Sequence, residues 1–177
     1  MGIFGRLFRC TPKEELNGIK LNLDEPFWEL TGKTDFPALF RALHEILPEN
    51  SILYFEGGSP SGQLLDFLNT KSVPEQTHVA VSTIWPRPDY YHVPATAENI
   101  SRLADISENI AEPELAVHFH IYCKGEVVLQ WHDVFSDPML LSCKLAEENV
   151  RTFAHRLNLK VTKWKNESEQ MARPDGE

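Results

Sequence analysis

Apolar and polar residues alternate along the chain with two different periods, and these periods predict its secondary structure. Apolar residues recur every three or four positions, as on the buried face of a helix, in segments near 35–47, 59–68, 96–110 and 146–157. A period of two, or a short continuous apolar run, predicts strands near 19–23, 51–58, 77–93, 115–122, 126–132 and 159–164. The chain is therefore predicted to be α+β: a mixed, mostly antiparallel sheet with about four helices packed on it.

The segment 115–132 is the clearest predicted β-hairpin, because its odd-numbered residues are almost all apolar on both strands. A two-residue turn at Lys124 and Gly125 would pair odd with even positions and turn half of the apolar set to the wrong face. A three-residue loop of Cys123, Lys124 and Gly125 avoids this conflict. We therefore predict that Tyr122 pairs with Glu126.

Three histidines share one face of the sheet in that register. His118 faces Gln130, His132 lies diagonally from His118, and His120 is on the same face. Alternate strand positions bring H-x-H imidazoles together, and neutral imidazoles suit zinc or iron. The functional interpretation is a metal site at His118, His120 and His132. The alternative is an ordinary sheet face, since neither an H-E-x-x-H motif nor a carboxylate at fixed spacing accompanies these histidines.

A glycine-rich segment joins the second predicted strand to the second predicted helix. Backbone amides of Gly57, Gly58, Ser59 and Ser61 at a helix start are candidates to bind an anion. The segment lacks the lysine of a Walker loop and the second glycine of a G-x-S-x-G nucleophile elbow. The alternative is an ordinary loop that caps the helix.

Prolines and aromatic residues gather at 85–92, where rigid side chains present contact area at low entropic cost. Trp85, Arg87, Tyr90 and Tyr91 are the candidate contact residues of this segment. The alternative is a proline-fixed turn whose aromatic side chains pack into the core.

The third predicted helix carries an acidic face. Glu98, Asp105 and Glu108 lie away from its apolar side, and the stretch from 98 to 114 holds five acidic residues and one arginine. Such a face is either simply solvated or a docking site for a basic partner.

The chain has 177 residues, 42% of them apolar, and a formal net charge of −9. This length predicts one domain, with a polar or flexible lead-in at 1–18, the domain at 19–165 and a disordered tail at 166–177. The negative charge disfavours nucleic-acid binding, which requires a basic face to neutralise phosphates.

Three widely spaced cysteines form no C-x-x-C motif and predict a reducing environment. The first ten residues lack the unbroken apolar stretch of a signal peptide, and no later run approaches the roughly 18 apolar residues of a membrane span. A cytoplasmic location is the resulting expectation.

These observations favour a non-catalytic domain that binds a basic protein partner without a cofactor, with the acidic helix and the 85–92 segment as its contact surface. Immunity proteins neutralise basic partners in this way, an analogy of composition alone. The alternative is a metal-dependent enzyme that uses zinc or iron on the histidine face.

Overall fold

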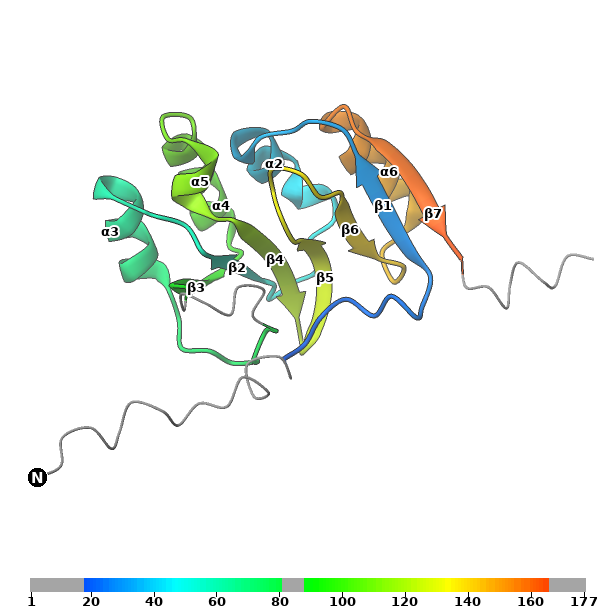
Figure 1. Ribbon diagram of the computed structural model, residues 1–177, viewed down its shortest axis with the longest axis horizontal. Coiled ribbons are helices and arrows are strands. Elements are labelled where there is room, and N and C mark those ends of the chain that lie inside the picture. The colour runs from blue at the N-terminus through cyan, green and yellow to red at the C-terminus, as the bar shows by residue number, and fades with distance from the viewer. Residues whose placement is uncertain (1–17, 81–87, 166–177) are drawn as a thin grey trace, which may run out of the picture.

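The computed structural model describes residues 18–80 and 88–165, which form one seven-stranded sheet (Figure 1). All six strand pairings are antiparallel, in the order β3-β2-β4-β5-β6-β1-β7. The strands are β1 (Phe27–Thr31), β2 (Ile52–Glu56), β3 (Tyr90–Pro94), β4 (His118–Cys123), β5 (Glu126–Trp131), β6 (Met139–Ser142) and β7 (Lys160–Trp164). The predicted α+β class is confirmed.

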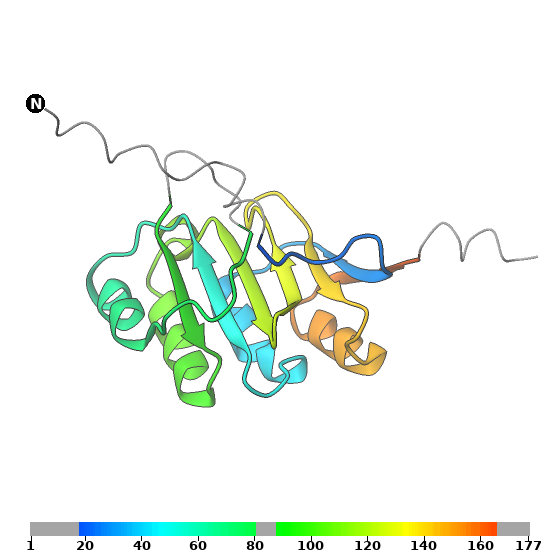
Figure 2. The same cartoon turned by 90° about the horizontal axis from the view of Figure 1, so that it is seen from below.

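The helices lie together on one side of the sheet, as Figure 2 shows. They are α2 (Phe36–Ala42), continued by a 3₁₀ turn (Leu43–Glu45), α3 (Gly62–Lys71), α4 (Ala97–Ser107), α5 (Glu112–Leu115) and α6 (Glu147–Arg156). The four helices predicted from the threefold to fourfold spacing are α2, α3, α4 and α6. The short α5 follows α4 and was not predicted as a separate helix.

Side-chain capping explains where two of these helices begin. The Asp35 carboxylate accepts a hydrogen bond from the Ala38 amide at 2.8 Å, and the Thr96 hydroxyl accepts one from the Asn99 amide at 3.2 Å. Each cap satisfies an amide that the first helical turn leaves without an intrahelical partner. Both starts agree with the predicted segments.

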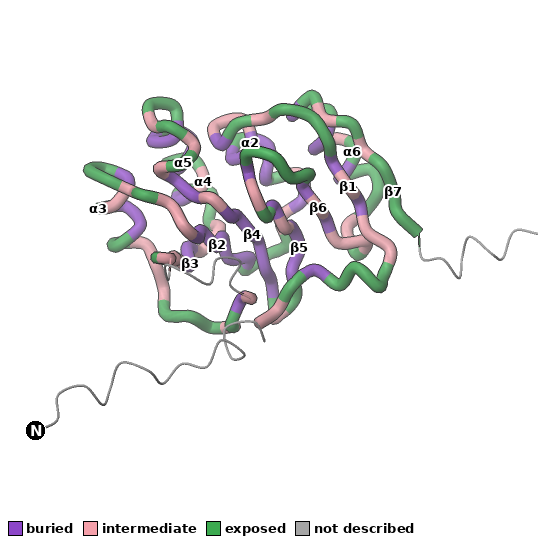
Figure 3. Tube along the Cα trace, viewed as in Figure 1, coloured by how far each residue is buried: buried purple, intermediate pink, exposed green. Residues whose placement is uncertain are grey.

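The main core fills the space between the sheet and the helices. Its strand residues include Leu53 and Phe55 of β2, which alternate with Tyr54 and Glu56 on the opposite face. All five residues of β2 are buried, as its continuous apolar run predicted. Figure 3 shows the same burial along β2, β4 and β5, and exposure along the edge strand β7.

The predicted register of the β4–β5 hairpin is wrong. Lys124 and Gly125 form a two-residue turn with φ of 51° and 80°, and Cys123 pairs with Glu126. A β-bulge then shifts the register, so that Ile121 pairs with Leu129 and His120 with Gln130. The extra residue of the bulge allows a two-residue turn while the apolar side chains of both strands stay on one face. The sequence pattern alone had instead predicted a three-residue loop.

The strand predicted at 19–23 is also wrong. Ile19 forms only an isolated bridge with Val79, and Leu23 is 53% exposed. Instead, the Leu21 amide donates to the Gln130 side chain at 3.0 Å, so this segment crosses the face of the sheet opposite to the helices (Figure 2). The strands β1 and β6 were not predicted from the sequence.

Several predictions fall outside the described residues. These are the lead-in up to residue 17, the tail from 166, and most of the strand expected between 77 and 85.

Candidate functional site

The outer side of α4 and α5 carries an acidic surface, which we define as Glu98, Asp105, Glu108, Glu112 and Glu114. The first three are exposed and the last two are half-buried. The opposite side of α4 packs its apolar side chains into the core, including Leu103 and Ile106. The predicted contact residues of the third helix are therefore accessible to a partner.

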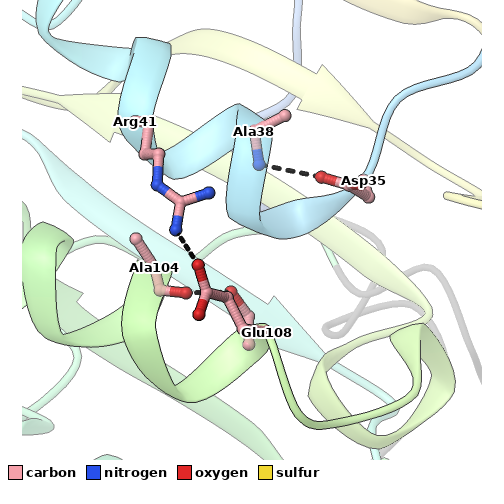
Figure 4. A network of polar contacts seen from close by, with 6 residues as sticks. Asp35, Ala38, Arg41, Ala104 and Glu108 are labelled. Atoms are coloured by element: carbon pink, nitrogen blue, oxygen red, sulfur yellow. Dashed lines mark hydrogen bonds and ion pairs between the residues drawn. The ribbon is translucent and has the colours of Figure 1, made fainter.

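Two of these carboxylates form intramolecular ion pairs, and Glu114 accepts a hydrogen bond from the Ala111 amide at 3.3 Å. The Lys71 ammonium lies 3.1 Å from Glu98, and the Arg41 guanidinium pairs with Glu108 (Figure 4). The side chains of both pairs are between 38% and 81% exposed. Exposed ion pairs contribute about 0–1 kcal/mol, so a partner's cations can compete for these carboxylates.

A cavity of about 440 Å³, which we call the anchor pocket, lies where α2 meets the end of α4 and α5. Asp35, Glu108 and Glu112 line it together with an apolar wall. The apolar lining comprises Phe36, Pro37, Ile110, Ala111, Pro113 and Leu115. The pocket thus joins apolar contact area to three carboxylates at one end of the acidic surface.

The predicted aromatic contact residues do not extend this surface. Trp85 and Arg87 lie outside the described residues. Tyr90 and Tyr91 belong to β3, where consecutive side chains point to opposite faces. Tyr91 packs against the main core, whereas Tyr90 lies near Tyr54 on the face opposite to the helices. The structure therefore separates Tyr90 from the acidic residues of α4.

The three predicted histidines do come together, through a register that the sequence did not indicate. The ring centroids of His118 and His132 are 4.9 Å apart, and those of His120 and His132 are 6.1 Å apart. His118 therefore neighbours His132, and Gln130 pairs with His120 instead. His118 and His120 are buried, and His132 is exposed.

The environment keeps the buried imidazoles neutral near pH 7. Burial, and after it the neighbouring His132, lower the pKa of His118 to about 4. Burial likewise lowers the pKa of His120 to about 3. In the described residues, no group of three His, Cys, Asp or Glu side chains has the arrangement of a metal site. The metal site thus stays a prediction.

A polar network that was not predicted from the sequence lies on the same face as these histidines. The Tyr54 hydroxyl donates to the fully buried Glu56 carboxylate at 2.9 Å, and the Tyr122 hydroxyl lies 2.9 Å from Nδ1 of His92. Burial and then the Glu56 charge raise the pKa of Tyr54 well above its ordinary value. The alternation of Tyr54 and Glu56 along β2 was the available signal, but it was hidden in a continuously buried strand.

The glycine-rich segment makes close backbone contacts with other parts of the fold. The Gly57 amide donates to the Asp89 carbonyl at 3.0 Å, and the Ser59 amide to the Pro113 carbonyl at 3.3 Å. A Cβ at Gly58 would lie 2.4 Å from the Leu115 carbonyl oxygen, so only glycine fits there. Ser61 is the N-cap residue of α3 but makes no side-chain cap. Two of the four predicted anion-binding amides are thus already used within the fold.

Comparison of the chain with protein-family models, curated proteins and solved structures gave no match. Among the described residues, none of the helices has the length and apolar character needed to cross a bilayer.

Proposed function

We propose that this chain is a non-catalytic domain that binds a basic protein through the acidic surface of α4 and α5. The observation that carries the proposal is the exposed row of Glu98, Asp105 and Glu108 on a helix whose other side is anchored in the core. Exposed carboxylates on a rigid helix attract a basic surface, speed its association and disfavour acidic partners. The adjoining anchor pocket adds apolar contact area at the end of this row.

The test is capture of a basic partner from the native host by wild-type protein and by the variant E98K/D105K/E108K. We expect wild-type capture to weaken as salt rises, because salt screens exposed charges, and the variant to capture much less. The matched control is D24K/D66K/E148K, which changes the net charge equally at exposed positions outside the acidic surface. Equal loss in the control, or capture that is indifferent to both sets of changes, would contradict the proposal.

A cytoplasmic location is part of this proposal. It is supported by Cys123 and Cys143, neither of which forms a disulfide within the described residues. Thiols persist in reducing compartments.

A second candidate function is metal-dependent catalysis on the histidine face. The close approach of His132 to both His118 and His120 favours it. Elemental analysis of purified protein tests this candidate. Stoichiometric zinc or iron that is lost in a triple His→Ala variant would support the enzyme, whereas a metal-free protein of undiminished stability would remove it.

A further inference from the structure

The anchor pocket combines acidic residues with apolar surface. Its lining residues include the apolar Pro37, Ile110 and Pro113, and three acidic residues, Asp35, Glu108 and Glu112, line the same pocket. An arginine side chain has the matching chemistry, because its aliphatic stem packs on apolar surface while its planar guanidinium binds carboxylates. We propose that the anchor pocket binds an arginine side chain of the basic partner. This inference rests on the proposed function and names the group by which the partner is held.

The chain itself places a guanidinium beside one of these carboxylates. Arg41 reaches from α2 to Glu108 on the turn that follows α4 (Figure 4). The side chains of Arg41 and Glu108 are 53% and 51% exposed, so water screens their pairing and weakens it. An arginine from a partner therefore competes with Arg41 for a carboxylate that already binds this group.

The remaining carboxylates leave the pocket with uncompensated negative charge. One oxygen of Asp35 accepts the Ala38 amide, which holds its side chain in place at the start of α2. Glu112 forms no ion pair with another described residue, although Lys33 lines a neighbouring cavity to which Glu112 also contributes. Because Arg41 neutralises only one of the three charges, the pocket retains attraction for a second cation.

The preference for arginine over lysine follows from the same lining. A guanidinium is more weakly hydrated than an ammonium group, and its fork of N–H donors can bind two carboxylates at once. Moving it against the apolar wall therefore costs less desolvation than moving a lysine ammonium group.

The test is an NMR titration of ¹⁵N-labelled full chain with N-acetyl-arginine amide, and with N-acetyl-citrulline amide as a neutral probe of nearly the same shape. We expect the arginine probe to shift the amide signals of Ala38, Ala111 and Glu112 in a saturable manner, and citrulline to leave them in place. Equal shifts with both probes, or shifts spread evenly along α4, would overturn the inference.

Two variants sharpen the test. E112Q should weaken arginine binding, because it removes charge while keeping the side-chain shape. R41A should strengthen binding by up to about fivefold, since it removes an exposed intramolecular competitor. The control for R41A is R151A, which breaks an exposed pair with Glu147 on α6 and should leave binding unchanged. Binding that is unaffected by E112Q would contradict the inference.

These outcomes separate the inference from the proposed function. Partner capture that depends on Glu98 and Asp105 but not on Glu112 would overturn the arginine anchor and leave the binding function standing. Saturable arginine binding in a protein that captures no partner in a charge-dependent manner would support the pocket and overturn the proposed function.

Discussion

On the sheet face opposite to the helices, two histidine side chains are buried, each with a ring nitrogen that lacks a hydrogen-bond partner in the described residues. His92 and His120 are each 3% exposed, and within the described part of the chain Nε2 of His92 and Nδ1 of His120 have no hydrogen-bond partner. A buried polar atom without a partner costs about 1–3 kcal/mol. Burial lowers the pKa of both imidazoles, so the folded state favours their neutral form.

Acid should destabilise the protein through His118 and His120. The unfolded imidazole has a pKa of about 6.5, and the folded pKa is about 4 for His118 and about 3 for His120. Between these values the unfolded state binds more protons, so the free energy of unfolding falls as pH decreases from about 6.5, by about 1.4 kcal/mol per pH unit for each imidazole. Urea unfolding at pH 7 and pH 5 measures this loss.

The variant H120Q should reduce that pH dependence, because it removes one of the two titrating groups. Q63A, at an exposed position on the helix side, removes no titratable group; it is the control and should leave the dependence unchanged. An equal pH dependence in H120Q and wild type would show that His120 does not carry the effect.

At the scale of elements, the local pattern located helices better than it located strands. The spacing of Phe36, Leu39, Phe40 and Leu43 predicted α2, and all four side chains are buried. This periodicity arises because one face of the helix is buried, so it can be recognised from the helix's own residues without reference to distant ones. The β4–β5 register instead depends on a bulge, which leaves no clear mark on the alternation of apolar residues.

The hairpin turn provides a test of this register. Both central residues have positive φ, and a Cβ at Gly125 would meet open space, so substitution there costs backbone strain alone. We expect G125A to lower the free energy of unfolding by about 1–2 kcal/mol. K124N should raise it slightly, because asparagine tolerates positive φ in a two-residue turn. Urea unfolding at neutral pH measures the free energy of unfolding of both variants. Changes of opposite sign in G125A and K124N are expected only if the turn has two residues.

At the scale of the whole molecule, the sheet joins distant parts of the chain. β1 lies between β6 and β7, whose residues follow it by more than a hundred positions. Leu30 on β1 is almost fully buried in the main core, and Glu29 points to the other face. Because strands from both ends of the described chain pair in one sheet, we expect these ends to unfold together.

Truncation of Leu30 should therefore destabilise the entire fold. L30A is expected to lower the free energy of unfolding by about 2–5 kcal/mol, the usual cost of emptying a buried leucine site. E29A on the same strand is the control and should cost much less. Far-UV circular dichroism and tryptophan fluorescence should report one coincident transition. Two separate transitions would contradict a single-domain fold.

The sequence by itself determined the α+β class, four of the helices, the β4–β5 hairpin and the shared face of His118, His120 and His132. These features depend on local periodicity, which side chains impose on their own segment. Only the tertiary structure decided the bulged register, the insertion of β1, the burial of Glu56 beside Tyr54, and the meeting of α2 with α4 that forms the anchor pocket. Each of these depends on contacts between residues far apart in the chain, and such contacts leave no periodic signal in either segment alone.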